Sequence, residues 1–205
     1  MLNAGNSFRW DAHGVLCRSA PAAPGHTASL KVVAPRVTPE ELDALDGVLR
    51  RLEEPWLPPS PDESVHYGYE PLGLAEFLAG LEVCAAHTRG RRFLDLGCGI
   101  GRSMLLALLM GWDVTGVEHH RPYAEVARRL VPEATVVERE AEEFEGYAAF
   151  DVVYSFRLCV EDEDQRGLER LIVSRMRPGS IIFLGHRVLT TPIAGESLGE
   201  NCWRV

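Results

Sequence analysis

Three glycines at alternate positions, Gly97, Gly99 and Gly101, follow directly on a short apolar run at residues 93–96. Because glycine lacks Cβ, the backbone at such a bend can turn sharply and a ligand can approach it closely. Good helix formers cover residues 104–110, and the first turn of a helix presents free N–H groups to that ligand. The stretch therefore predicts a strand, a tight bend and a helix, the opening unit of a nucleotide-binding α/β sheet.

Two acidic residues accompany this bend. Asp95 lies at the end of the first apolar run, and Glu118 ends the next one, residues 114–117, after room for one helix and one strand. An acid in that second position can accept hydrogen bonds from both hydroxyls of a ribose. The spacing is Gly-x-Gly-x-Gly, whereas dinucleotide enzymes have Gly-x-Gly-x-x-Gly. A nicotinamide dehydrogenase is therefore a distant hypothesis.

The composition bounds the class of protein. The 205 residues, 46% of them hydrophobic, predict one domain with an appendage and a real core. The net charge of −9 disfavours a large nucleic-acid surface, which needs basic residues. The five cysteines lack metal-site spacing, so we expect free thiols in a reducing, cytoplasmic compartment and no bound metal. No uncharged apolar run approaches the ~20 residues of a membrane helix, and the start does not resemble a signal peptide.

The chain divides into three expected segments. Residues 1–36 lack helical or strand periodicity and are expected to form a flexible or loosely docked segment. Residues 37–64 hold a helix whose start has the pattern of a capping box, from Thr38 to Glu41, and whose end is a proline-rich connector. This helix either covers the active site or only packs on the domain. Residues 65–205 form the main domain.

Further strands are expected at residues 134–137, 150–156 and 181–184, where short apolar runs recur. Between the first two of these runs, residues 138–143 are mostly acidic. Acidic side chains are favoured at a helix N-terminus, so the pattern predicts that a solvated helix begins there.

Taken together, residues 65–187 resemble the class I S-adenosylmethionine-dependent methyltransferases. That family has an acid before a Gly-x-Gly-x-Gly bend and a second acid after the next strand. Its fourth strand has a Phe-Asp-Val-Val pattern, as residues 150–153 do, and a Pro-Gly turn leads into its fifth strand, as residues 178–179 do. The resemblance implies an α/β fold with a doubly wound, mostly parallel sheet of order 3-2-1-4-5 and an N-terminal helical arm.

The chain departs from the family pattern after residue 185. The family normally adds a helix and an antiparallel strand pair after the fifth strand, and the residues left here are too few for both. We therefore expect shortened C-terminal strands. An open sheet edge would then need cover from the N-terminal segment or from a second subunit.

The resemblance also implies roles for individual residues. Asp95 and the glycines would meet the amino-acid end of S-adenosylmethionine, Glu118 its ribose, and Glu140 with Ala141 its adenine. The residues implied for cofactor binding are Tyr67, Asp95, Gly97, Cys98, Gly99, Gly101, Glu118, His119, Glu140, Ala141 and Tyr154. The residues implied near the transferred methyl group are Tyr154, Ser155 and His186.

Several of these residues have a purely structural alternative. Tyr67 could anchor a loop as a half-buried aromatic side chain, and Glu140 could belong to a solvated helix start. For His119, the resemblance implies a cofactor contact in which the ring packs flat on the adenine. His186, whose unperturbed pKa would lie near ~6.5, is a general base in one interpretation and a half-exposed loop residue in the other.

The implied function is that of an enzyme, a methyltransferase dependent on S-adenosylmethionine, whose chemistry needs positioning rather than a protein nucleophile. The acidic charge and the absence of an Asn/Asp-Pro-Pro-Tyr/Phe signature favour a small-molecule acceptor over a protein and a protein over nucleic acid. A homodimer is a further expected assembly, which the sequence alone does not decide. The alternative function is a non-catalytic S-adenosylmethionine-binding module or a subunit of a methyltransferase complex, because the C-terminus is short and no base is evident.

Overall fold

The structure, a computed structural model, describes residues 8–10, 16–18, 38–56, 73–185 and 195–205. The chain forms two compact units, residues 1–36 and residues 37–205. In the first unit, β1 (Phe8–Trp10) and β2 (Leu16–Arg18) pair as an antiparallel ribbon. The second unit holds every other described element.

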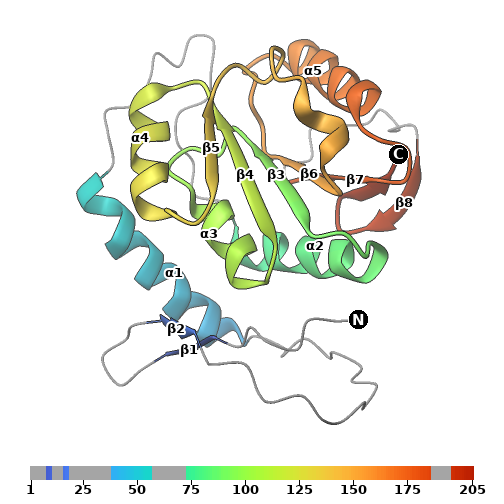
Figure 1. Cartoon of the computed structure of the whole chain (residues 1–205). Helices are drawn as coiled ribbons and strands as arrows, with labels where there is room; N and C mark the ends of the chain where they lie inside the picture. Colours follow the sequence, from blue (N-terminus) through green and yellow to red (C-terminus); the bar gives the residue numbers. More distant parts are fainter. Residues whose placement is uncertain (1–7, 11–15, 19–37, 57–72, 186–194) are drawn as a thin grey trace. The chain divides into compact units, whose positions relative to one another are not determined.

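One seven-stranded sheet organises the second unit, in the order β5-β4-β3-β6-β7-β9-β8 (Figure 1). Its parallel strands are β3 (Arg92–Leu96), β4 (Asp113–Glu118), β5 (Thr135–Glu138), β6 (Val152–Ser155) and β7 (Ile181–Leu184). This is the expected order 3-2-1-4-5, and it confirms the α/β fold. The connections leave β3 and β6 in opposite directions, so the carboxyl ends of these two strands flank the switch point where such sheets bind ligands.

Helices cover both faces of the sheet. They are α1 (Pro39–Glu53), α2 (Leu74–His87), α3 (Arg102–Leu109), α4 (Arg121–Leu130) and α5 (Asp162–Arg175). Helices α2 and α3 lie on one face and α5 on the other (Figure 1). Phe77 of α2 packs with Phe93 and Phe183 in one core, and Ile172 of α5 packs with Val153 in the other. Strands β6 and β7 are buried throughout, which accounts for their continuous apolar sequence.

Helix α1 begins where the sequence predicts. Thr38 caps it and forms a capping box with Glu41, in which each residue's side chain accepts a hydrogen bond from the other's backbone N–H. The short 3-10 helix η1 (Glu54–Trp56) follows, and most of the predicted connector lies outside the described residues. No helix in the described ranges is both long enough and apolar enough to cross a membrane.

Two expectations about the sheet's connections are wrong. The edge of β7 is not open, because β9 (Cys202–Arg204) pairs with it antiparallel and β8 (Glu196–Gly199) pairs with β9. These strands are shortened, as expected, but neither the N-terminal segment nor a second subunit is needed to cover β7.

The expectation that a helix begins in the acidic stretch 138–143 is the second one that is wrong. After the end of β5, this stretch forms a turn, and the 3-10 helix η2 (Gly146–Ala149) follows it. The link to β6 is short, and its backbone N–H groups bond to carbonyls three residues back rather than four.

Candidate functional site

The glycine bend between β3 and α3 adopts a backbone that favours glycine. Gly97, Gly99 and Gly101 have φ angles of 66°, 54° and 96°, in the left-handed region that other residues rarely enter. The N–H groups of Gly97 and Cys98 donate to the carbonyl of Val117, at 2.8 and 3.1 Å, and so tie the bend to β4. No side chain caps α3, so its first N–H groups are available to a ligand.

Glu118 holds the bend from the neighbouring strand. Its Oε2 accepts a hydrogen bond from the Gly99 N–H at 2.8 Å, and its Oε1 accepts one from the His120 N–H at 2.7 Å. The residue is only 5% exposed. A carboxylate offers about four acceptor positions, so both oxygens keep capacity for hydroxyl donors from a ligand. The structure therefore places this predicted acid against the predicted bend.

Asp95 adds a second buried carboxyl group to the same region. It is 1% exposed, and the Ser103 hydroxyl donates a hydrogen bond to it. Burial raises the pKa of Asp95 to about 7, an effect that the Ser103 hydrogen bond opposes and the Glu118 carboxylate reinforces. The bend thus combines two acids that a positively charged ligand would stabilise. We call the bend with Asp95 and Glu118 the cradle.

A turn after β5 borders the cradle. The Arg139 N–H donates to the Glu118 carbonyl at 3.1 Å, and the Tyr147 hydroxyl donates to the Ala141 carbonyl at 2.6 Å. Ala141 is buried and Glu140 is half-buried. Within the described residues the Ala141 N–H has no hydrogen-bond partner, so it is available to a ligand.

The two adjacent histidines after β4 differ in their contacts. The ring Nδ1 of His119 lies 3.4 Å from Glu118 Oε1, with its side chain 30% exposed. The ring of His120 packs edge-to-face on Tyr123, and its buried Nε2 has no hydrogen-bond partner in the described part of the chain. The described ranges contain no group of three or more His, Cys, Asp or Glu residues that could hold a metal ion.

The side chain of Cys98 is buried, and its sulfur lies 3.9 Å from the Gly99 carbonyl oxygen. It lies in the core beside Met104, and a Cβ on Gly116 would come within 2.6 Å of its sulfur. Burial raises the pKa of this thiol well above its ordinary value, so the thiol is neutral. Only the backbone of Cys98 is therefore available to a bound ligand.

Tyr154 and Ser155, which we expected together near the methyl group, point to opposite faces of the sheet, as consecutive strand residues do. The Tyr154 ring packs on Phe77 and Phe183, with centroid separations of 4.9 and 4.8 Å. Ser155 is fully buried, and its hydroxyl donates to the Phe156 carbonyl at 3.0 Å. The structure therefore does not bring these two hydroxyls together.

The remaining two predicted site residues, Tyr67 and His186, lie outside the described residues. Their roles stay predictions, and the site must be built from the described residues around them.

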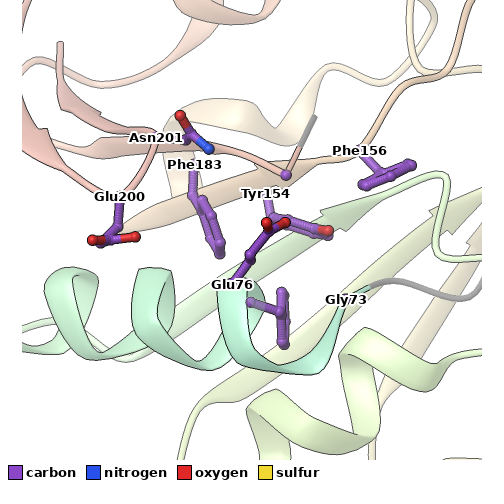
Figure 2. A pocket seen from close by; sticks show the side chains of 9 residues that line it. Gly73, Glu76, Tyr154, Phe156, Phe183, Glu200 and Asn201 are labelled. Atoms are coloured by element: carbon purple, nitrogen blue, oxygen red, sulfur yellow. The ribbon is translucent and has the colours of Figure 1, made fainter. Parts of the chain in front are cut away.

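A cavity of about 290 Å³ lies beside Tyr154 (Figure 2). It is formed by the N-terminus of α2, the carboxyl ends of β6 and β7, and the turn between β8 and β9. Sequence reasoning missed it because its walls come from four separate segments. Since Tyr154 pairs in the sheet with Asp95, and paired strands lie about 4.8 Å apart, the cavity adjoins the cradle. We call it the aromatic pocket.

Arg102 is a further residue that sequence reasoning missed. Its guanidinium group, with a side chain 2% exposed, pairs with Glu53 at 3.0 Å and also with Asp46. These two acids are seven residues apart, which places them on one face of α1. The pairs tie α1 to the first residue of α3, directly after the bend. The i and i+7 spacing of Asp46 and Glu53 shows in the sequence that both acids share one face of the helix, but nothing in the sequence indicated Arg102 as their partner.

The central part of this chain is similar in sequence to known proteins. Residues 93–179 match a family model described as a methyltransferase domain. The cypemycin N-terminal methyltransferase from Streptomyces sp is 34% identical over 101 residues, covering 46% of this chain and 41% of that protein. The O-methyltransferase cnsE from Penicillium expansum is 32% identical over 112 residues, covering 51% of this chain and 41% of that protein. This chain thus spans about two-fifths of the length of these relatives.

Among solved structures, an RNA methyltransferase from Salinibacter ruber in complex with S-adenosyl-L-homocysteine is 19% identical. It superposes with a TM-score of 0.49, covering 56% of this chain and 76% of that one.

Proposed function

We propose that this chain, whose residues 93–179 match a methyltransferase-domain model, belongs to the class I S-adenosylmethionine-dependent family and transfers a methyl group from S-adenosylmethionine to a small-molecule acceptor. The observation that carries the proposal is the hydrogen bond of 2.8 Å between the Gly99 N–H and the Glu118 carboxylate. This contact joins a bend that a ligand can approach closely to an acid that can accept from ribose hydroxyls.

The charge of the cradle supports S-adenosylmethionine as the cofactor. That molecule carries an ammonium and a sulfonium group, and the cradle offers two buried acids, Asp95 and Glu118. In our proposal Asp95, with the backbone of the bend including Cys98, holds the amino-acid end, and Glu118 holds the ribose. The free N–H of Ala141 and the carboxylate of Glu140 would meet the adenine, and His119 would pack on its face.

The chemistry asks the protein mainly to position two ligands and to exclude water. When bound, S-adenosylmethionine supplies an electrophilic methyl group on its sulfonium sulfur. Tyr154 lines the aromatic pocket and pairs in the sheet with Asp95 of the cradle, and we propose that it lies near the transferred methyl group. Tyr67 keeps its predicted role in cofactor binding, and His186 keeps its predicted place near the transferred methyl group.

The size of the aromatic pocket supports a small-molecule acceptor. A volume of about 290 Å³ lies just below the usual range for ligand sites, ~300–1,000 Å³, and so suits a compact ligand. The names of the two relatives describe transfer to an N-terminus in one case and to oxygen in the other, so both kinds of acceptor atom occur in similar proteins. A protein acceptor ranks behind a small molecule, and nucleic acid ranks last because the chain is acidic.

We further propose the three-segment organisation of residues 1–36, 37–64 and 65–205, and a cytoplasmic location. The close approach of Cys84 and Cys202, whose sulfurs lie 3.7 Å apart as free thiols, suits a reducing compartment. A homodimer is a separate prediction, which light scattering on the purified protein tests.

Calorimetric titration with S-adenosylhomocysteine tests the proposed function. We expect saturable binding, and we expect Glu118→Ala to weaken it by about tenfold or more, since loss of hydrogen bonds to a charged group costs ~1.5–3 kcal/mol. Glu138→Ala, on the neighbouring strand, is the matched control and should keep the affinity within about twofold.

Absence of binding to the folded wild-type protein would refute the proposed function. Binding without turnover over a broad panel of acceptors would instead favour the alternative of a non-catalytic module.

A further inference from the structure

The aromatic pocket has walls suited to a flat apolar body. Four aromatic side chains line it from three elements and one loop: Phe77, Tyr154, Phe156 and Phe183. Figure 2 shows the Glu76 and Tyr154 side chains directed into the space between Phe183 and Phe156. Aromatic faces carry negative electrostatic potential, so they attract cations as well as apolar groups.

The charged residues of the pocket all have one sign. Two carboxylates, those of Glu76 and Glu200, stand among its described lining residues, and that lining contains no lysine, arginine or histidine. Both are exposed at the mouth, and neither has an ion-pair partner in the described ranges. A ligand entering here therefore meets uncompensated negative charge.

The Tyr154 hydroxyl is a polar group without a partner in this cavity. The residue is only 3% exposed, yet the hydroxyl has no hydrogen-bond partner within the part of the chain that the structure describes. Burial, followed by the charges of Asp95 and Glu76, raises the pKa of this phenol well above its ordinary value, so it stays neutral. The hydroxyl oxygen faces the cavity and is not sealed in the core, so a ligand with a donor or acceptor group can form a hydrogen bond with it.

Glycine keeps the space in front of this hydroxyl open. A Cβ on Gly185 would come within 2.4 Å of the Tyr154 hydroxyl oxygen and 2.9 Å of the Phe156 ring. The turn that carries Glu200 is fixed as well, because the Asn201 carbonyl accepts from the Leu184 N–H at 2.9 Å. Glu200 and Asn201 have φ angles of 46° and 57°, as a two-residue hairpin turn requires.

We propose that the aromatic pocket binds the methyl acceptor, and that this acceptor is a protonated amine with a flat aromatic or apolar body. The body lies between the rings, the ammonium group faces Glu76 and Glu200, and the Tyr154 hydroxyl accepts a hydrogen bond from the ligand. This inference rests on the proposed function, because the pocket serves as an acceptor site only beside a bound cofactor.

Three probes of equal body and different charge test the proposal: 2-phenylethylamine, 2-phenylethanol and 3-phenylpropionate. Each is titrated into the full chain saturated with S-adenosylhomocysteine, with binding followed by ligand-observed NMR. We expect the amine to bind at least about tenfold more tightly than the alcohol, and the acid to bind most weakly, since a charge-assisted hydrogen bond is worth about that factor.

Variants test whether residues of the aromatic pocket cause the preference for the amine. In the double variant Glu76→Gln and Glu200→Gln, the preference for the amine over the alcohol should fall to about twofold. Gly185→Ala should weaken binding of both probes by about tenfold or more. Glu82→Gln, an exposed acid of α2 outside the pocket, should change neither affinity.

All variants should bind S-adenosylhomocysteine within about twofold of the wild type, which separates this test from that of the proposed function. Retained cofactor binding with equal affinity for the three probes, or an amine preference that survives the double variant, would overturn the proposal. If Gly185→Ala lowers the melting temperature, the glutamate variants alone decide.

Discussion

The cradle and the aromatic pocket adjoin at Tyr154 but are built in different ways. The cradle uses backbone groups from one contiguous bend, which hydrogen bonds to the Glu118 carboxylate and the Val117 carbonyl tie to β4. The pocket uses side chains from segments that are distant in the chain and are assembled by the sheet order. In the cradle, buried charge is concentrated before any ligand binds, whereas the pocket has apolar walls and charge only at its mouth.

This difference indicates how the two sites tolerate change. A bend made of backbone and left-handed glycines leaves little freedom to vary without losing the ligand. A pocket of side chains can be altered one wall at a time, so specificity for an acceptor can change while the cofactor site stays constant.

The largest expected effect concerns the buried acid of the cradle. The pKa of Asp95 rises from 3.8 to about 7 on folding, so the unfolded chain ionises first as the pH increases. The folded state therefore loses stability between pH 4 and 7, by up to roughly 4 kcal/mol, and the loss stays constant above pH 7. Asp95→Asn should remove it, so we expect the variant to be more stable than the wild type at pH 8 and similar at pH 4.

Urea unfolding of both proteins at a series of pH values measures this difference. Asp113→Asn, an exposed acid at the start of β4, is the control and should change stability by less than ~0.5 kcal/mol. Parallel curves for wild type and Asp95→Asn between pH 4 and 8 would show that Asp95 is not a destabilising charge. Asp95→Asn should also bind S-adenosylhomocysteine more weakly, since the amino group of this ligand would lose the Asp95 carboxylate as a charged partner.

A smaller effect is expected where α1 is tied to the cradle. Arg102→Met removes the guanidinium group that pairs with the buried Glu53 carboxylate at 3.0 Å, and breaking a buried ion pair costs ~3 kcal/mol or more. Arg170→Met removes an exposed pair with Glu163 and should cost less than ~1 kcal/mol. Denaturant unfolding compares the two, and similar small losses for both variants would contradict a structural role for Arg102.

The smallest effect is expected at Ser155. Its hydroxyl faces away from the Tyr154 side of the sheet, so Ser155→Ala should cost only about 1 kcal/mol of stability for its single hydrogen bond. Cofactor affinity and acceptor turnover should stay within about twofold. A tenfold loss of turnover in a stable variant would instead place this hydroxyl at the methyl-transfer site, as the sequence first suggested.

The sequence predicted the cradle well because its determinants are local. Alternate glycines after a strand define a bend by their backbone conformation alone, and the position of Glu118 follows from one helix and one strand. The order of the five parallel strands followed from the family resemblance. The side chain of Cys98 was harder to place, since a bend can turn any one side chain into the core.

The pocket could not be predicted in the same way. Glu76, Phe183 and Glu200 meet only because α2 packs on β7 and the last hairpin joins that edge, and no sequence spacing encodes such distances. The pairing of Arg102 with α1 has the same origin. The acidic stretch after β5 misled us because its charge suits a helix start, while the short link to β6 permits only a turn.

A crystal structure of the protein with S-adenosylhomocysteine tests the central claim most directly, through the distances between the ribose oxygens and the Glu118 carboxylate. We expect both ribose hydroxyls within about 3.2 Å of that carboxylate, and the amino-acid end of the ligand against the bend at Gly97 and Gly99. A complex in which the ribose lies away from Glu118, while its carboxylate keeps only Gly99 and His120, would contradict the account.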